Sequence, residues 1–181
     1  MRGQPNEEDV WRLHHARVLL DLAGLVKRRR GVWSRTRRGT QLAAPERAGA
    51  LLAALVRAHF RRFNLAYVDG VGPAPGLQYT VGYTLYRFGQ VGTEWRRPAE
   101  LADLVVLPGV RHEVPPRGPA GASYDPMVLA LETRVLRPLV GFGLAAAQAP
   151  PEELGAWAVA VSYRKAPSFD RLFRFTVGDG S

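Results

Sequence analysis

Seven positive charges and no negative charge fall within the twelve residues 27–38 of this sequence. Charged side chains are costly to bury without a partner, so this segment has to lie at the surface whatever backbone structure it adopts. The hydrophobic core must therefore be built from residues on either side of it. The basic residues of the run are Lys27, Arg28, Arg29, Arg30, Arg35, Arg37 and Arg38.

The net charge of the 181-residue chain is +9, and the whole surplus lies in its first third. Residues 1–63 contain 14 Lys and Arg against 5 Asp and Glu, whereas residues 64–181 contain 11 of each. Segregated positive charge favours a polyanionic partner. Nucleic acid is the first choice and an acidic protein or an anionic membrane surface is the second. A basic turn that is merely solvated is the structural alternative.

The basic run is predicted to form a β-hairpin. Residues 25–29 and 32–35 are the predicted strands, and between them Gly31 supplies the positive φ that a tight turn requires. An amphipathic helix is predicted over residues 7–23, with its end at Gly24. Its apolar face carries Leu13, Ala16, Leu19, Leu20 and Ala23, and its opposite face carries His14, Arg17 and Asp21.

A second helical region is predicted after the hairpin. Thr36 is a predicted helix N-cap, and a longer helix is predicted over residues 45–67. The outer face of that helix carries Arg57, Arg61 and Asn64. Its predicted buried stripe consists of Ala48, Leu52, Leu55, Val56, His59 and Phe63.

Residues 69–76 are rich in glycine and proline and are predicted to link a first unit, residues 1–68, to a second unit, residues 77–181. The pattern of residues 77–86 fits a helix or a strand. The helix is preferred because a stripe of Leu77, Val81, Leu85, Phe88 and Trp95 continues for about five turns, longer than strands usually run. The remaining predictions are helices over 98–107 and 126–139, an irregular loop over 108–126, and a C-terminal hairpin of strands 157–163 and 171–177.

Two segments of the chain are faintly similar to each other. Residues 16–25 resemble residues 133–139, which reach Gly143-Leu144 four residues later, and each segment leads from a predicted helix into a hairpin-like region. This similarity supports an architecture of two related units.

The order of elements in the first unit resembles the recognition helix and wing of winged-helix repressors of the MarR type, a helix-turn-helix class. The order is a helix, Gly24-Leu25-Val26, basic residues, Gly31, a strand and Thr36-x-x-Gly39-x-x-Leu42. The resemblance covers residues 10–43. It implies that the helix enters the major groove of DNA while the wing contacts the flanking backbone or minor groove. Two features depart from the family pattern: few residues precede Val10, and Asp21 on the reading face would repel phosphate.

The order of elements in residues 77–177 is also similar to a winged helix, with weaker motifs. The chain resembles, more weakly still, the carboxy-terminal part of uncharacterised plasmid-type bacterial proteins.

Carried over to this sequence, the winged-helix resemblance places Arg12, His14 and Arg17 on or beside the recognition helix. Arginine can bond phosphate or guanine through two parallel hydrogen bonds, and Arg30 at the hairpin tip is suited to a narrow minor groove. Trp33 can stack on a base, although packing within the hairpin is the preferred interpretation. The predicted nucleic-acid-binding residues are Arg12, His14, Arg17, Lys27, Arg28, Arg29, Arg30, Trp33, Arg35, Arg37 and Arg38.

No catalytic residue, cofactor or metal site is predicted. The chain has no cysteine, which removes thiol catalysis and thiolate metal sites. His14 and His15 point about 100° apart on a helix, so they are poor co-ligands, and His59 is predicted to be a core residue. The glycine pattern of residues 141–146 matches dinucleotide sites in letters only, because it follows a helix and lacks an acid about 20 residues on.

Residues 1–10 contain acids where a signal peptide needs an apolar core, and no apolar run reaches the roughly 18 residues that span a bilayer. We expect a soluble cytoplasmic protein with no membrane partner. The predicted fold is α+β and mostly helical: a basic winged-helix-like unit, then a second such unit with a C-terminal β-hairpin.

The predicted function is DNA binding, as a transcriptional regulator, with the second unit mediating a homodimer or a contact with another protein. The alternatives are a protein-interaction module that keeps the winged-helix shape without reading DNA, and an enzyme whose chemistry the sequence does not indicate.

Overall fold

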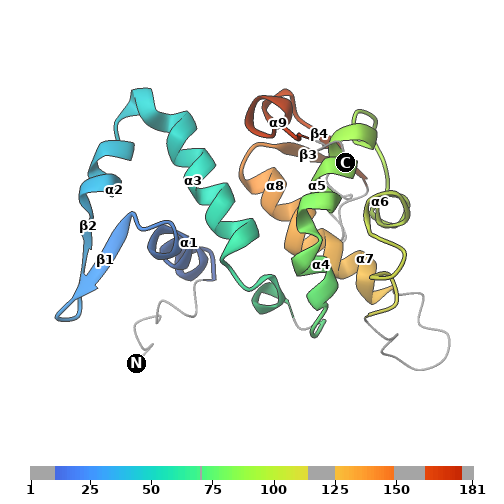
Figure 1. Ribbon diagram of the computed structural model, residues 1–181, viewed down its shortest axis with the longest axis horizontal. Coiled ribbons are helices and arrows are strands. Elements are labelled where there is room, and N and C mark those ends of the chain that lie inside the picture. The colour runs from blue at the N-terminus through green and yellow to red at the C-terminus, as the bar shows by residue number, and fades with distance from the viewer. Residues whose placement is uncertain (1–10, 70, 114–124, 149–161, 177–181) are drawn as a thin grey trace, which may run out of the picture. The chain divides into compact units, whose positions relative to one another are not determined.

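The computed structural model describes residues 11–69, 71–113, 125–148 and 162–176. It is mostly helical with short antiparallel strand pairs, as expected for the predicted α+β class (Figure 1). The chain divides into two compact units, Met1–Asn64 and Leu65–Ser181.

The first unit contains α1 (Trp11–Leu22), the strands β1 (Val26–Arg29) and β2 (Val32–Arg35), α2 (Arg37–Leu42), the 3-10 turn η2 (Pro45–Arg47) and α3 (Ala48–Arg61). The predicted end of the first helix is confirmed, because Gly24 follows α1 with a φ of +69°. Residues 7–10 of the predicted helix lie outside the described residues.

The predicted hairpin is confirmed. Strands β1 and β2 pair in antiparallel register with Arg29 opposite Val32, so Arg30 and Gly31 form a two-residue turn. Both turn residues have positive φ, +51° and +82° respectively, which is the type I′ geometry that matches the twist of the strands.

Thr36 caps α2 as predicted. Its Oγ1 accepts a hydrogen bond from the N–H of Gly39 at 2.9 Å and donates one to the carbonyl of Gly24 at 2.8 Å. The main-chain N–H of Thr36 also donates to the carbonyl of Leu25 at 3.0 Å. One residue therefore fixes the start of α2 against the start of the hairpin.

The predicted helix over residues 45–67 is shorter in the structure. Helix α3 runs from Ala48 to Arg61 and is followed by a break before the 3-10 turn η3 (Leu65–Val68), which belongs to the second unit. Within the predicted buried stripe, Val56, His59 and Phe63 are buried, Leu52 and Leu55 are partly buried, and Ala48 is exposed. The C-terminal half of α3 thus supplies most of its buried contacts.

The described helices and strands of the second unit begin, after η3, with α4 (Pro75–Tyr79), α5 (Val81–Val91) and α6 (Pro98–Val105). They continue with α7 (Pro126–Leu131), the π-helical segment η4 (Glu132–Leu136), α8 (Arg137–Gly141), the strands β3 (Ala145–Gln148) and β4 (Ser162–Lys165), and α9 (Pro167–Leu172). The ambiguous segment at 77–86 is helical, and Leu77, Val81, Leu85 and Phe88 are buried as the helical stripe requires. Trp95 lies beyond the helix and is exposed.

The predicted linker at residues 69–76 is instead part of the second unit. The carboxylate of Asp69 accepts hydrogen bonds from Nε and Nη2 of Arg134 at 2.9 and 2.8 Å, and from the hydroxyl of Thr133 at 2.6 Å. The side chains of Asp69 and Arg134 are only 5% and 2% exposed. A buried bidentate ion pair ties this segment down, which its glycine and proline content does not reveal.

The predicted C-terminal hairpin of residues 157–163 and 171–177 is wrong in its pairing. Strand β4 pairs with β3, with Ala145 opposite Lys165 and Gln148 opposite Ser162. Pro167 then begins α9, which includes Arg171 and Leu172, because proline is well suited to the first turn of a helix. Residues 157–161 and 177 lie outside the described residues.

The two strand pairs begin in the same way. Gly24 and Gly143 both donate from N–H to the carbonyl three residues earlier, and Leu25 and Leu144 donate to the carbonyl five residues earlier. Each β-strand pair is then followed by a short helix, α2 or α9. These matching bonds pair Leu20 with Leu139 and Gly24 with Gly143, a register two residues away from the one in which the two segments resemble each other in sequence.

Candidate nucleic-acid interface

The candidate interface is the basic hairpin, defined here as residues 26–35. Residues that pair across two strands share a face of the hairpin, and neighbours along a strand alternate between faces. The face toward α1 carries Val26, Arg28, Trp33 and Arg35, and the other face carries Lys27, Arg29, Val32 and Ser34. Both faces therefore present positive charge.

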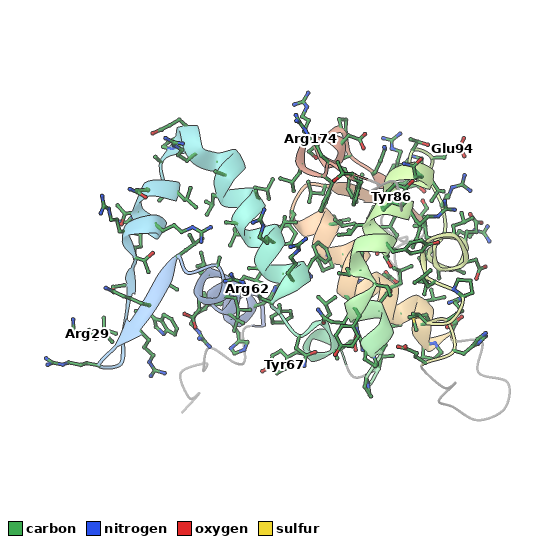
Figure 2. The ribbon with its side chains drawn as sticks, viewed as in Figure 1. Arg29, Arg62, Tyr67, Tyr86, Glu94 and Arg174 are labelled. Atoms are coloured by element: carbon green, nitrogen blue, oxygen red, sulfur yellow. The ribbon has the colours of Figure 1, made fainter. Side chains whose placement is uncertain are left out.

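The basic side chains of the hairpin are available to a ligand. Lys27, Arg28, Arg29, Arg30 and Arg35 are all exposed, and Arg29 extends into solvent (Figure 2). Across the part of the chain that the structure describes, none of these five makes an ion pair or a side-chain hydrogen bond. No carboxylate of a described residue neutralises their charge.

Arg30 occupies a backbone conformation that arginine rarely adopts. Its φ of +51° makes it the one non-glycine residue with positive φ among the described residues. Asparagine, aspartate and glycine are the residues that favour this turn position, because a side chain with an ordinary Cβ pays roughly 1 kcal/mol there. An arginine at the tip is thus unfavourable for the turn itself, which points to a role for its side chain.

Arg17 is engaged with the hairpin rather than directed away from it. Its guanidinium carbon lies 5.0 Å from the ring centroid of Trp33, a cation–π arrangement. Its Nη2 also lies 3.3 Å from Nδ1 of His14. Trp33 thus contacts a side chain of α1, whereas the prediction was packing within the hairpin, and Arg17 joins the helix to the hairpin.

The other predicted contact residues are outside the hairpin, on α1 and α2. Arg12 is on α1, and His14 is half-buried on the same helix. Arg37 and Arg38 are exposed on α2, and Arg38 extends toward α3, as described below. The structure thus brings the hairpin residues together with Arg17 and separates Arg38 from them.

A cluster of aromatic rings holds α1 against α3. His15 makes edge-on contacts with His59 and Phe63, at centroid distances of 5.4 and 5.0 Å, and His59 stacks on Phe63 at 5.6 Å. His59 is fully buried, as predicted. Burial lowers the pKa of His15, and the neighbouring His14 lowers it further. Among the residues that the structure describes, no group of three or more His, Cys, Asp or Glu side chains is placed to hold a metal ion.

Two features of this region were missed by sequence reasoning. One is the positive φ of Arg30, since the turn prediction rested on Gly31 alone. The other is Val32, an apolar side chain 67% exposed beside the turn. The alternation of the strand could have revealed it, because Val32 shares a face with Lys27 and Arg29.

Comparison with known proteins does not assign the chain to a family. No protein-family model, curated protein or solved structure matches it. Separately, none of the helices described in the structure has both the length and the apolar character needed to cross a lipid bilayer.

Proposed function

We propose that this protein binds duplex DNA and that the basic hairpin is its principal contact with the phosphate backbone. The observation that carries the proposal is the set of five exposed hairpin cations, none of which has a carboxylate partner among the described residues. Guanidinium groups match phosphate oxygens in charge and in geometry. An exposed strand pair with cations on both faces can reach both sides of a groove.

The hairpin tip is proposed to enter the minor groove. Arg30 is the first residue of the two-residue turn at the hairpin tip, and the exposed Val32 follows the turn at the start of the second strand. A narrow minor groove attracts arginine through its negative potential, and apolar side chains are used by minor-groove binders to contact the sugar edges and base steps. The unfavourable backbone of Arg30 is accounted for if its side chain makes this contact.

Both units are proposed to be winged-helix modules. In the first, α1 would be the recognition helix and the basic hairpin the wing. The second unit would follow the winged-helix order of helix, short strand, two helices and hairpin. The corresponding elements are α5, the isolated bridge between Arg96 and Tyr163, α6, the helices α7 to α8, and the pair β3–β4. We further propose that the protein is a cytoplasmic transcriptional regulator and that the second unit supplies a dimer or partner contact.

Sequence reading by α1 is expected to be weak. The guanidinium of Arg17 already packs on Trp33, and the exposed Asp21 would repel phosphate on the outer face of the helix. This observation favours a second candidate function, in which the same basic hairpin binds an acidic protein surface and reads no DNA. Folds of this kind are used for both purposes.

Fluorescence anisotropy with a random-sequence duplex at two salt concentrations tests the proposal. Binding that neutralises about five phosphates has a log–log salt slope near −4 to −5. The triple variant Arg28→Ala, Arg29→Ala and Arg30→Ala is expected to weaken binding at least about 30-fold and to flatten this slope by roughly 3.

A matched control removes three exposed arginines outside the hairpin: Arg61→Ala, Arg171→Ala and Arg174→Ala. Net charge changes equally in both triple variants, so a larger loss in the hairpin variant identifies a specific contact surface. Equal losses in the two variants, or no binding by the unaltered protein at 50 mM salt, would reject the proposal.

A further inference from the structure

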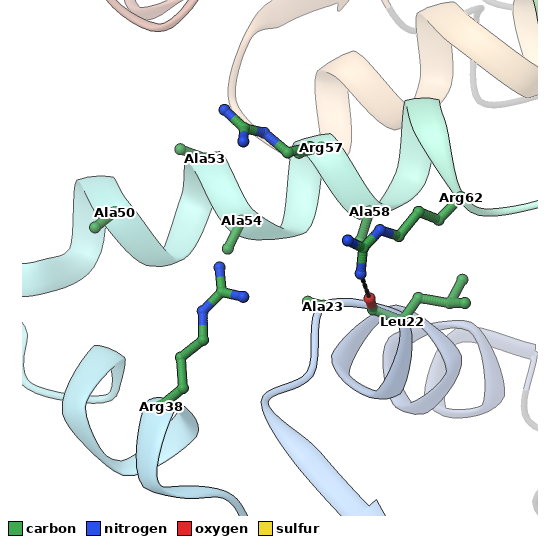
Figure 3. Close-up of a pocket in the computed structure, with 9 residues that line it drawn as sticks. All are labelled: Leu22, Ala23, Arg38, Ala50, Ala53, Ala54, Arg57, Ala58 and Arg62. Atoms are coloured by element: carbon green, nitrogen blue, oxygen red, sulfur yellow. Dashed lines mark hydrogen bonds between the residues drawn. The ribbon is translucent and has the colours of Figure 1, made fainter.

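The first unit contains a hollow of about 300 Å³ where the C-terminal end of α1 meets α2 and α3. Its α3 wall is formed by alanine side chains, including Ala54 and Ala58. Figure 3 shows Arg38 extending from α2 toward Ala54, and Arg62 extending from beyond α3 toward Leu22. Arg57 completes the basic lining on the other side of the helix in this view.

The hollow carries positive charge that the described part of the chain does not neutralise. No acidic side chain is among its described lining residues. Arg38 has no ion pair or side-chain hydrogen bond with any described residue. Arg62 donates one hydrogen bond from Nη1 to the carbonyl of Leu22 at 2.8 Å, which holds its guanidinium in place and leaves its other N–H groups for a ligand.

The wall of the hollow near the two guanidinium groups is apolar, and its alanine side chains project only a short way from α3. Ala54 and Ala58 are four residues apart on α3 and therefore lie on one face, separated by about one helical turn or roughly 5.4 Å. Their methyl groups let a ligand approach closely. The hollow therefore has an apolar alanine wall with guanidinium groups of Arg38 and Arg62 among its lining side chains.

We propose that this hollow is a binding site for a small organic dianion, a short aliphatic chain with a carboxylate at each end. Guanidinium groups bind carboxylates through charge-assisted, often bidentate hydrogen bonds, and the alanine methyls accept the methylene groups. A volume of about 300 Å³ is at the lower end of the range for small-molecule sites. This site is independent of the DNA-binding function proposed above.

Isothermal titration of the full chain with three probes of equal chain length, without DNA and at fixed ionic strength, tests the site. The probes are adipate with two carboxylates, hexanoate with one, and 1,6-hexanediol with none. Loss of one charge-assisted contact corresponds to about tenfold in affinity or more, so adipate is expected to bind at least that much more tightly than hexanoate. The diol is expected not to bind.

Two variants address the charge and the shape of the hollow separately. Arg38→Gln removes a guanidinium that has no partner among the described residues, and Ala54→Leu fills the hollow without changing charge. Each is expected to weaken adipate binding about tenfold or more. Arg61→Gln is the control, because Arg61 is an exposed arginine on the same helix that does not line the hollow. Circular dichroism confirms that each variant is folded.

The inference is overturned if adipate binds no more tightly than hexanoate, or if no heat is detected with adipate at roughly 10 mM. Equal effects of Arg38→Gln and Arg61→Gln would also reject it, as would unchanged affinity in Ala54→Leu. The inference is also rejected if adipate does not bind and Arg38→Gln weakens duplex binding as strongly as the triple hairpin variant. Arg38 would then belong to the nucleic-acid interface. Failure of the DNA experiment alone leaves the adipate result standing.

Discussion

Gly24 and Gly143 have the same backbone φ of +69°, and each ends a helix through the same pair of main-chain hydrogen bonds. The parallel extends further along the chain. Thr36 donates its hydroxyl to the carbonyl of Gly24, and Ser168 donates its hydroxyl to the carbonyl of Gly143. In each unit a hydroxyl at the start of the next short helix therefore bonds back to the glycine that precedes the strand pair.

Replacement of Gly24 or Gly143 by alanine is expected to cost about 1–2 kcal/mol of unfolding free energy, because a Cβ is unfavourable at positive φ. An added Cβ would meet no atom within 4 Å at either site, so the cost is conformational rather than steric. Urea denaturation measures it. Gly49→Ala is the control, since Gly49 has no positive φ and equal open space. Stabilities of Gly24→Ala and Gly143→Ala equal to that of the control would contradict this explanation.

Gly39→Ala is expected to be far more damaging than either of those changes. A Cβ at this position would lie 1.9 Å from the carbonyl oxygen of Leu25, which is main chain and cannot rotate away. The contact would separate α2 from the start of the hairpin. We expect a loss of at least about 3 kcal/mol in urea denaturation, in the range of severe core substitutions. A loss below 1 kcal/mol would show that α2 can shift freely.

Arg30→Asn is expected to make the protein more stable and its DNA binding weaker. Asparagine tolerates positive φ at this turn position, so the melting temperature should rise by a few degrees for a gain of roughly 0.5–1 kcal/mol. Removal of the cation should lower duplex affinity about tenfold at low salt. If DNA affinity and stability instead change in the same direction, it is wrong that Arg30 destabilises the turn and strengthens DNA binding.

Arg134→Met is expected to lower unfolding free energy by about 3–5 kcal/mol, the usual cost of breaking a buried ion pair from one side. The substitution leaves the carboxylate of Asp69 buried without its bidentate partner. The double variant Asp69→Asn with Arg134→Met should recover part of the loss, because neither position then carries a buried charge that has lost its partner. Guanidinium chloride denaturation measures the coupling between the two sites. If the loss of unfolding free energy in the double variant equals the sum of the losses in the two single variants, the expected coupling is contradicted.

The first unit is expected to lose stability as pH falls below about 6.5. Burial lowers the pKa of His15 in the folded state, so below the unfolded value near 6.5 the unfolded chain binds a proton that the folded chain resists. Stability from this group is therefore present above that pH and lost below it. His15→Phe keeps an aromatic ring in the cluster and removes the titration. Its midpoint in urea should fall less between pH 7.5 and 5.5 than that of the unaltered protein.

Local signals in the sequence were sufficient for residues 24–36 of the first unit, but not for the bounds of α3. Gly24 predicts the end of a helix, Gly31 a tight turn and Thr36 a helix cap. Each of these features lies where its residue predicts it. The charge run predicted an exposed segment, and its cations are exposed.

Long-range contacts were not predictable in the same way. Nothing local to Asp69 indicates that Arg134, 65 residues later, binds it. Strand β4 pairs with residues 145–148, an alanine-rich stretch with little alternation of its own. The hollow beside α3 depends on how α1, α2 and α3 pack together, which brings Arg38 and Arg62 into the lining of one hollow although they are 24 residues apart.

The ion pair between Asp69 and Arg134 also determines where this chain can be divided in the laboratory. A fragment that begins at residue 77 would lack Asp69, so the guanidinium of Arg134 would be buried without its carboxylate partner. That fragment is expected to misfold. A fragment beginning at Leu65 keeps both members of the pair and is the one to express for separate study of the C-terminal unit.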